Sequence, residues 1–304
     1  MIRIAVIGVG HIARHEHLPA LKQSPSFDLV AAVSPVPVDL PVPVFESIAA
    51  LMESGIAVDA VAICTPPDRR YALAREAIEA GWHVLLEKPP TLTRSQAQAL
   101  RDLARSEGVT IFAAWHSIYA SAIPRIRSLL SDIDPVSIAI TWKENADKWH
   151  PGADWLWRPG ALGVFDAGIN ALSILTATNA EPVVFQEARL DFYADQQAPA
   201  RAELSLTGGR TACPITASFD WRHDPDSEIW EIRWSLPEGD TLCLAKGGAH
   251  LSRGEHVIPL EESREYAGVY RHFAQLIDTG EMSLDLRPLD LVSEALAYGA
   301  RCRH

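Results

Sequence analysis

The first 115 residues alternate between short apolar runs and longer helical patterns, and this alternation restricts the fold more than any other feature of the chain. The apolar runs are IRIAVIG, FDLVAAV, VDAVAIC, GWHVLLE and GVTIFAA, at residues 2–8, 27–33, 58–64, 81–87 and 108–114. Strands that are apolar throughout and are separated by helices are typical of a parallel sheet covered on both faces. The sequence therefore predicts an N-terminal doubly wound α/β domain.

Between these runs the sequence carries the signals that begin and end helices. The segment TRSQAQALRDLARSEG begins with Thr93, a good helix cap, and stops at Gly108. A second helical pattern covers residues 68–81. The proline-rich segment 34–47 is predicted to be an extended loop, with a short helix after Phe45.

The character of the chain changes near residue 118. Beyond it, apolar and polar residues alternate along five segments, at residues 135–144, 183–193, 200–207, 212–222 and 227–236. Alternation with a period of two is typical of an antiparallel sheet that buries one face. Helical patterns occur at residues 163–178, 265–278 and 288–301.

The predicted organisation is therefore a dinucleotide-type α/β domain at residues 1–118 and a C-terminal α+β domain at residues 119–304. The second domain should hold a large open, mainly antiparallel sheet. The last helix is a candidate to pack back on the first domain. The sheet is also a candidate surface for a homo-oligomer, although alternation does not distinguish a dimer face from a solvated one.

A glycine turn follows the first predicted strand and opens a helix pattern. In IAVIGVGHIA, Gly8 permits a tight turn, Gly10 lets the backbone approach a pyrophosphate, and Ala13 keeps the helix close to the strand. The helix N-terminus offers free N–H groups to the anion. We therefore predict a Rossmann dinucleotide-binding domain with Gly8, Gly10, His11 and Ile12 at the pyrophosphate; the alternative is a turn required only by sterics.

The end of the second strand bears on the choice between NAD and NADP. It reads AAVSPVPV, with Ser34 at the strand end and no charge before Asp39. An acidic residue there would bind the NAD ribose, and a basic one the phosphate of NADP. The lack of an adjacent arginine favours NAD, with NADP left open. The nearest basic candidates, Arg69 and Arg70, are interpreted as solvated residues of a helix start.

Polar and proline-rich residues follow three consecutive strands of the predicted sheet, where ligands of open α/β sheets bind. The predicted cofactor-binding residues are Ser34 at the end of the second strand, Cys64, Thr65, Pro66 and Pro67 at the end of the third, and Glu87 and Lys88 at the end of the fourth. His116 follows the fifth strand. It is predicted to bind substrate, and the alternative is a hydrogen-bonded structural histidine.

The motifs GVGHIA, CTPP, EKPP and GVFDAGIN together resemble those of the glucose–fructose oxidoreductase/inositol dehydrogenase (Gfo/Idh/MocA) family of nicotinamide-dependent oxidoreductases. The resemblance covers essentially the whole chain. The stretch WKENADKWHPGADWLWRPGALGVFDAGINALSI, residues 142–174, is most similar to the branch of bacterial aldose 1-dehydrogenases that act on D-galactose and L-arabinose. The resemblance implies hydride transfer from C1 of an aldopyranose to the nicotinamide, which yields an aldonolactone.

The resemblance also implies the catalytic residues. Lys88 matches the family's catalytic lysine, which often precedes a cis proline, and Asp166 and Asn170 match a family pair on one helix. Many members have His at the last position, but an Asn does not titrate and can only hydrogen-bond the sugar. Lys88 is then the group expected to accept the C1 proton in its neutral form. The alternative for Lys88 is an ion pair with Asp166.

Tryptophans and polar residues after Trp115 suggest a monosaccharide pocket. Indole rings pack against the C–H faces of pyranoses, while the sugar hydroxyls need hydrogen-bond partners. The predicted substrate-binding residues are His116, Glu144, Trp149, His150, Asp166, Asn170 and Trp230. For each tryptophan the alternative is packing against the sheet, and for Glu144 it is a solvated position.

The composition narrows the classes of partner. The net charge of −12 argues against nucleic acid and anionic membranes as partners, because both require clustered Lys and Arg. No apolar stretch approaches the length of a membrane span or signal peptide. The four cysteines are far apart, which favours free thiols in a reducing compartment. We expect a soluble cytoplasmic protein without a metal site.

Three functions remain open at this point. The first is the NAD(P)-dependent aldose 1-dehydrogenase, and the second is a cyclitol dehydrogenase or another sugar oxidoreductase of the same family. The third is a non-catalytic nucleotide-sensing regulator, which would not need Lys88, Asp166 or Asn170. The sequence does not determine the preferred aldose, because a few hydroxyl contacts decide it.

Overall fold

The computed structural model describes residues 1–149, 151–179, 181–194, 196–209 and 212–304, which form two compact units. Unit 1 comprises Met1–His116 and Arg264–Leu286, and unit 2 comprises Ser117–Ser263 and Arg287–His304. Unit 1 therefore takes in a segment far along the chain, which contains the penultimate helix. The last helix groups with unit 2, although the sequence left it as a candidate for the first domain.

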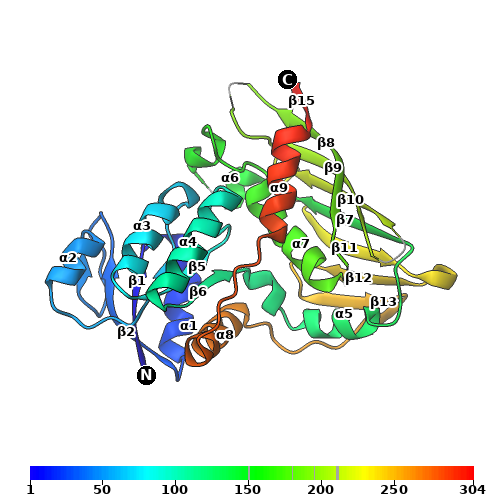
Figure 1. Ribbon diagram of the computed structural model, residues 1–304. Coiled ribbons are helices and arrows are strands. Elements are labelled where there is room, and N and C mark those ends of the chain that lie inside the picture. The colour runs from blue at the N-terminus through cyan, green and yellow to red at the C-terminus, as the bar shows by residue number, and fades with distance from the viewer. Residues whose placement is uncertain (150, 180, 195, 210–211) are drawn as a thin grey trace. The chain divides into compact units, whose positions relative to one another are not determined.

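Unit 1 is built on a six-stranded parallel sheet with the order β3-β2-β1-β4-β5-β6 (Figure 1). Its strands are β1 (Ile2–Ile7), β2 (Phe27–Val33), β3 (Val44–Phe45), β4 (Ala60–Ile63), β5 (His83–Glu87) and β6 (Ile111–Ala114). This order, with its reversal between β1 and β4, is that of the dinucleotide-binding Rossmann fold. The predicted fold of this part of the chain is confirmed.

Helices cover both faces of this sheet, as continuous apolar strands require. They are η1 (Ala13–His17), α1 (Leu18–Gln23), α2 (Ile48–Glu53), α3 (Pro67–Glu79), α4 (Arg94–Glu107) and α8 (Glu265–Thr279). Apolar residues of α2, α3 and α4 pack on one face of the sheet. On the other face Phe273 of α8 stacks on Phe27 and Phe112. The predicted cap is also confirmed, since the Thr93 hydroxyl accepts the N–H of Gln96.

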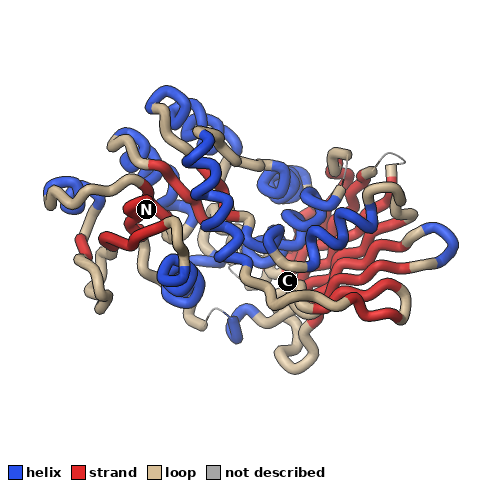
Figure 2. The backbone as a smooth tube through the Cα atoms, turned by 90° about the horizontal axis from the view of Figure 1, so that it is seen from below, coloured by secondary structure: helices blue, strands red, loops and turns tan. Residues whose placement is uncertain are grey.

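Unit 2 holds a nine-stranded sheet with the order β14-β13-β12-β11-β7-β10-β9-β8-β15. The strands are β7 (Ser137–Lys143), β8 (Val184–Phe192), β9 (Arg201–Gly208), β10 (Cys213–Asp220), β11 (Ile229–Ser235), β12 (Thr241–Ala245), β13 (His250–Arg253), β14 (His256–Ile258) and β15 (Ala300–Arg303). Figure 2 shows these strands side by side. Among the described strands of this second sheet, only the β7–β10 and β8–β15 pairs are parallel, so the predicted mainly antiparallel sheet is confirmed.

The remaining described helices belong to unit 2, where α7 packs against β7, α5 and α9, and α9 also packs against β8. They are η2 (His116–Tyr119), which begins at the unit boundary, α5 (Ala122–Leu130), α6 (Ala146–Trp149), η3 (Asp154–Trp157), α7 (Phe165–Thr178), η4 (Pro237–Gly239) and α9 (Arg287–Tyr298). The sequence missed α5 and β12 to β15. Most of these strands are too short to show a recognisable alternation of apolar and polar residues. Strands β13 and β14, for example, span only four and three residues.

The cysteines and the lengths of the helices relate to two predictions made from the composition. All four cysteines lie in the described part of the chain and are free thiols, as predicted. Within the described ranges, no helix is both long enough and apolar enough to span a bilayer.

Two glycines fix the position of α7, the helix that carries Asp166 and Asn170. Gly163 has φ of +55°, and a Cβ added there would lie 2.2 Å from the carbonyl oxygen of Pro199. That same oxygen accepts the N–H of Val164 at 2.8 Å. A Cβ at Gly168 would lie 3.0 Å from the ring of Phe219 on β10. The glycines of GVFDAGIN therefore let the helix approach its neighbours closely.

We expect Gly163→Ala to lower the free energy of unfolding by about 3 kcal/mol, because the methyl group adds a backbone clash to an unfavourable positive φ. Gly160→Ala is the matched control. Gly160 has φ of +82°, but no described atom lies within 4 Å of its added Cβ, so this variant tests the backbone penalty alone. Urea unfolding measures both. Equal losses in the two variants would show that the contact with Pro199 has no cost.

Candidate active site

The glycine turn after β1 has the geometry that the sequence predicts. Gly8 has φ of +89°, and an added Cβ would lie 2.7 Å from the methyl carbon of Thr65, so no larger residue fits. No described atom lies within 4 Å of a Cβ added at Gly10, which leaves its backbone accessible. Helical structure begins at His11 and Ile12 and continues through the π-helical turn η1. Single π turns inside helices are frequent at functional sites.

The residues around this turn fit a dinucleotide. The hydroxyl oxygen of Thr65 is buried and has no hydrogen-bond partner among the described residues. Such a group normally has a partner when buried, so a ligand that hydrogen-bonds Thr65 would complete the site. The first N–H groups of the helix after Gly10 are also available to an anion. Both features lie at the carboxyl ends of neighbouring strands of unit 1.

The other predicted cofactor residues of this rim have defined positions, while their contact with a cofactor stays a prediction. The Ser34 hydroxyl donates to the carbonyl of Val36 at 2.7 Å. Cys64 is buried. Pro66 and Pro67 form the N-terminus of α3, where the missing N–H of proline costs nothing.

Arg70 is buried, so its interpretation as a solvated residue is wrong. Its side chain is 5% exposed, and Nε donates to the carbonyl of Thr65 at 2.8 Å. Nη1 donates to the carbonyls of Glu87, at 2.8 Å, and of Pro89. Arg69, one position earlier on α3, is exposed as predicted. The two arginines point to different sides of the helix, and the sequence DRR alone does not show which of them is buried.

Glu87 lies at the end of β5 with a fully buried carboxylate that three groups of unit 1 contact. Its Oε1 accepts the hydroxyl of Tyr266 at 2.6 Å and lies 3.1 Å from Nε2 of His17. Its Oε2 accepts the backbone N–H of Lys88 at 2.9 Å. Behind His17, Nδ1 lies 2.7 Å from the hydroxyl of Tyr270. Glu87 therefore anchors the strand end, and a direct contact with the cofactor stays a prediction.

The charges of this cluster compensate one another. Burial by itself raises the pKa of Glu87, but the hydrogen bond and the charge of His17, together with the charges of His116 and Arg70, lower the pKa well below its ordinary value. Burial also opposes the charge on His17, yet Cys64, Tyr270 and Glu87 raise its pKa well above 6.5. The pKa of Tyr266 is raised by burial and by the negative charge of Glu87. The cluster thus holds an ionised carboxylate–imidazolium pair.

Lys88 follows this anchor and is half-buried, and its peptide bond to Pro89 is cis, which the sequence left open. His116 lies beside the anchor, because its ring stacks on Tyr266 with 5.4 Å between centroids. Its Nδ1 lies 2.6 Å from a carboxylate oxygen of Glu265 on α8. His116 thus has a structural contact, and its role in binding substrate stays a prediction.

In unit 2, Asp166 and Asn170 lie one helical turn apart on α7, with side chains almost completely buried. Residues at this spacing share one face of a helix. The hydroxyl of Ser173 donates to the carbonyl of Asn170 at 2.7 Å. The structure therefore places the two residues as the sequence motif implies within this unit.

Glu144 follows β7 and binds two indole rings. Its Oε2 accepts the N–H of Trp142 at 2.6 Å, and its Oε1 accepts the N–H of Trp221 at 2.8 Å. Trp230 on β11 packs edge-on against Trp142, with 5.1 Å between ring centroids. The carboxylate of Glu144 is therefore held in place by two indole donors, and its contact with a sugar stays a prediction.

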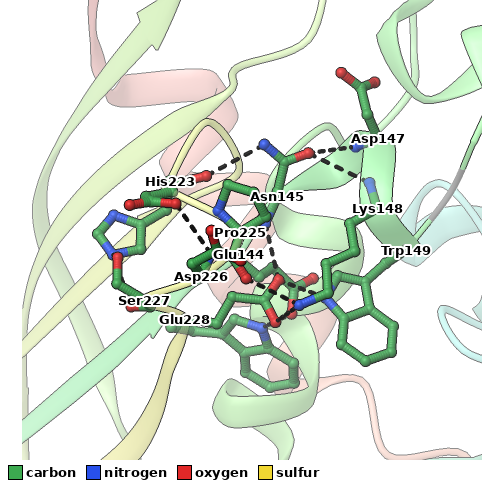
Figure 3. A network of polar contacts seen from close by, with 12 residues as sticks. Glu144, Asn145, Asp147, Lys148, Trp149, His223, Pro225, Asp226, Ser227 and Glu228 are labelled. Carbon is green, nitrogen blue, oxygen red and sulfur yellow. Dashed lines mark hydrogen bonds and ion pairs between the residues drawn. The ribbon is translucent and has the colours of Figure 1, made fainter.

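Trp149 ends α6 and is 54% exposed, which is unusual for so large an apolar side chain. Figure 3 shows that Glu228 holds it and its neighbour. One oxygen of Glu228 accepts the indole N–H at 2.8 Å, and the other lies 2.7 Å from Nζ of Lys148. Contacts with the ammonium and the indole keep the pKa of Glu228 below its ordinary value against the opposing effect of partial burial. His150, also a predicted substrate residue, lies outside the described residues.

Sequence reasoning missed the residues that hold the predicted ones in place. They are His17, Arg70, Tyr266, Tyr270 and Glu228. Tyr266 lies 179 positions from Glu87, so no local spacing could reveal the contact. Within the described ranges, no group of three or more His, Cys, Asp and Glu residues could hold a metal ion.

The chain is similar to known proteins in both sequence and fold. Residues 2–115 match the sequence profile of the oxidoreductase family with an NAD-binding Rossmann fold, Gfo/Idh/MocA. The chain is 40% identical to galactose 1-dehydrogenase of Pseudomonas fluorescens over 99% of its own length and 96% of that protein. It is 38% identical to D-galactose-1-dehydrogenase of Rhizobium etli, whose crystal structure it matches with a TM-score of 0.93 over 100% of this chain and 96% of that one.

A more distant structure shows the fold alone. A 3-ketoreductase from Actinomadura kijaniata, solved in complex with NADP and TDP-benzene, is 22% identical and matches with a TM-score of 0.85. The match covers 100% of this chain and 99% of that one.

The Glu87–His17 pair makes stability depend on pH in a defined direction. The pKa of Glu87 is lowered from 4.5, so its contribution is complete above that pH and is lost as the pH falls toward the lowered value. The pKa of His17 is raised from 6.5, so its contribution is complete below 6.5 and is lost as the pH rises through the raised value. Both contributions are therefore complete between these two pH values.

Glu87→Gln should lower the free energy of unfolding by about 3 kcal/mol or more at about pH 6, because it leaves a buried imidazolium without its partner. The difference from the wild type should shrink at about pH 3, because Glu87 is protonated in the unfolded chain there, which lowers the free energy of unfolding of the wild type. Urea unfolding at both pH values measures it. Glu79→Gln, at an exposed carboxylate paired with Arg75, is the control and should change little. A loss of unfolding free energy that is the same at both pH values would contradict an ionised Glu87–His17 pair.

Proposed function

The chain belongs to the Gfo/Idh/MocA oxidoreductase family and is an NAD(P)-dependent sugar dehydrogenase, and on this premise we propose that it oxidises C1 of an aldopyranose of the D-galactose or L-arabinose type to the aldonolactone. The observation that carries the proposal is the 40% identity to galactose 1-dehydrogenase of Pseudomonas fluorescens along 96% of that protein. Because the similarity spans both units, it supports the proposal for the second unit as well as for the nucleotide-binding part of the chain.

We propose that Lys88 accepts the proton of the C1 hydroxyl. When bound, NAD(P) supplies the hydride acceptor. Lys88 follows the carboxyl end of β5, where ligands of open α/β sheets bind, and the anchoring of its N–H by Glu87 holds the backbone in place. The neutral amine is the form that accepts a proton.

Asn170 and Asp166 are proposed to bind the sugar from α7. The amide of Asn170 can donate and accept hydrogen bonds but cannot exchange a proton at ordinary pH. It therefore holds a hydroxyl in place and leaves the proton to Lys88. Asp166, one turn earlier on the same face, provides an acceptor for a second hydroxyl.

Trp149 is proposed as the surface on which the C–H face of the pyranose packs. Its N–H is bound to Glu228, so the ring is fixed while half of its area stays exposed. Glu144, Trp230 and His116 are proposed as further sugar contacts, together with His150 from the sequence alone. A rigid indole gains contact area with a sugar at little cost in side-chain entropy.

The cofactor is proposed to be NAD rather than NADP. Strand β2 ends at Val33 and is followed by Ser34, whose hydroxyl already donates to Val36. We further propose a cytoplasmic location and a homo-oligomer formed through the sheet of unit 2. The alternative function is a cyclitol dehydrogenase or another sugar oxidoreductase of the family, since these enzymes would share the nucleotide site.

Purified protein incubated with NAD⁺ should reduce it when D-galactose or L-arabinose is added, as the absorbance of the reduced cofactor reports. Lys88→Met should lower kcat by about 10²- to 10⁴-fold, the usual contribution of a general base, while NAD⁺ binding stays close to that of the wild type. Lys22→Met, at an exposed lysine of α1, is the control. Turnover of a cyclitol but of no aldose would replace the proposal by its alternative, and a near-normal rate in Lys88→Met would exclude the lysine as the proton acceptor.

Trp149→Ala should raise the KM for the sugar about tenfold, because it removes about 1.4 kcal/mol of ring packing from the bound state. The KM for NAD⁺ should not change. Glu228→Gln should raise the sugar KM by a smaller factor, since its amide oxygen can still accept the indole N–H but loses the ion pair with Lys148. Asp147→Asn, at an exposed neighbour on α6, is the control. An unchanged sugar KM in Trp149→Ala would remove this residue from the sugar site.

A further inference from the structure

The sequence Glu87-Lys88-Pro89-Pro90 limits how the backbone at the end of β5 can be held by hydrogen bonds. Neither proline has an N–H, so this segment offers few donors and must be held mainly through its carbonyl groups. The N–H of Lys88 is already bound by the side chain of Glu87. The carbonyls of Glu87 and Pro89, on the two sides of Lys88, are two of the groups that need a donor.

Arg70 contacts both of these carbonyls with one nitrogen. Nη1 donates to the Glu87 oxygen at 2.8 Å and to the Pro89 oxygen, while Nε donates to the Thr65 oxygen at 2.8 Å. The guanidinium therefore joins the loop after β4 to the loop after β5. A planar fork with five N–H donors can do this, whereas a lysine has a single nitrogen at the end of a flexible chain.

The burial of Arg70 indicates that this contact is specific. The side chain is 5% exposed, and burying a charge is costly unless its donors are satisfied. The hydrogen-bond acceptors are main-chain oxygens of Thr65, Glu87 and Pro89, so the contact fixes backbone positions. The charge of Arg70 also helps to lower the pKa of the Glu87 carboxylate. Thr65 also carries the buried hydroxyl without a described partner, which places the cofactor-side loop in the same network.

We propose that Arg70 is a positioning residue, which holds the peptide units on both sides of Lys88 in register with the Thr65 loop. The proposal rests on the proposed function, because it assigns Arg70 to the placement of the proton acceptor relative to the cofactor. A displacement of about 1 Å of a reacting group can cost about 10²-fold in rate. Without Arg70 the Lys88 segment keeps its strand and its Glu87 anchor but loses the contacts that align it with the neighbouring loop.

The test compares Arg70→Met and Arg70→Lys with the wild type. Arg69→Met, at the exposed arginine one position earlier, is the matched control. Arg70→Met should lower kcat by about 10²-fold with a much smaller change in the KM for the sugar. Arg70→Lys should keep the charge but recover only part of the rate. Added methylguanidinium should raise the rate of Arg70→Met and leave Arg69→Met unchanged.

A second measurement does not depend on turnover. The rate at which an amine-reactive reagent labels Lys88 in the free protein, followed by mass spectrometry of the peptide, should rise about tenfold in Arg70→Met as the segment becomes more mobile. Labelling of Lys22 serves as the internal reference. NAD⁺ titration without sugar should show binding within a few-fold of the wild type. These readouts remain valid if the wild type oxidises no aldose, so failure of the proposed function can be told from failure of the present inference.

Unchanged labelling of Lys88 together with a kcat close to the wild type in Arg70→Met would overturn the proposal. A loss of kcat that follows thermal stability equally in Arg70→Met and Arg70→Lys, without rescue by methylguanidinium, would show that Arg70 only stabilises the fold. If Arg70→Met does not fold, Arg70→Lys decides the question. Faster Lys88 labelling and reduced kcat in folded Arg70→Lys support the proposal, and wild-type values of both overturn it.

Discussion

The structure of unit 1 depends on a single buried negative charge, the carboxylate of Glu87. Such a charge is tolerated only when it is paired and fully hydrogen-bonded, and its partners come from the π turn after the glycine loop, from α8 and from the following backbone N–H. Because Tyr266 lies so far along the chain, the requirement explains why residues 264–286 fold with the first 116. The strand end that precedes Lys88 is thus fixed from three directions.

Carboxylates have the same use in unit 2, where they orient aromatic rings. Glu144 accepts the N–H groups of two indoles, and Glu228 accepts that of Trp149. An indole has a single donor, so one acceptor in a fixed place sets the direction of the whole ring. In both units, then, acidic residues that a sequence reading would treat as surface or ligand positions act first as acceptors that hold other groups.

The features that could be predicted from the sequence are those that depend on local geometry. Gly8, the Thr93 cap and the alternation of β7 to β11 follow from backbone conformation and from side-chain direction along the chain, and the structure confirms them. Arg70 was misinterpreted because burial of an arginine depends on carbonyls of loops that only the folded sheet brings together. The short strands β12 to β15 were missed because their pairing partners, not their composition, make them strands.

The close approach of Gly163 to Pro199 limits which positions of the protein can be varied in protein engineering. The loop that leads into α7 has no room for even one extra carbon atom at this position, so its path is set by the main chain of another segment. Random libraries that include position 163 would lose most of their members to misfolding before any change in selectivity could be screened. Substitutions at exposed positions of α6, such as Asp147, are expected to change the free energy of unfolding far less, which makes this helix the more practical region for directed evolution.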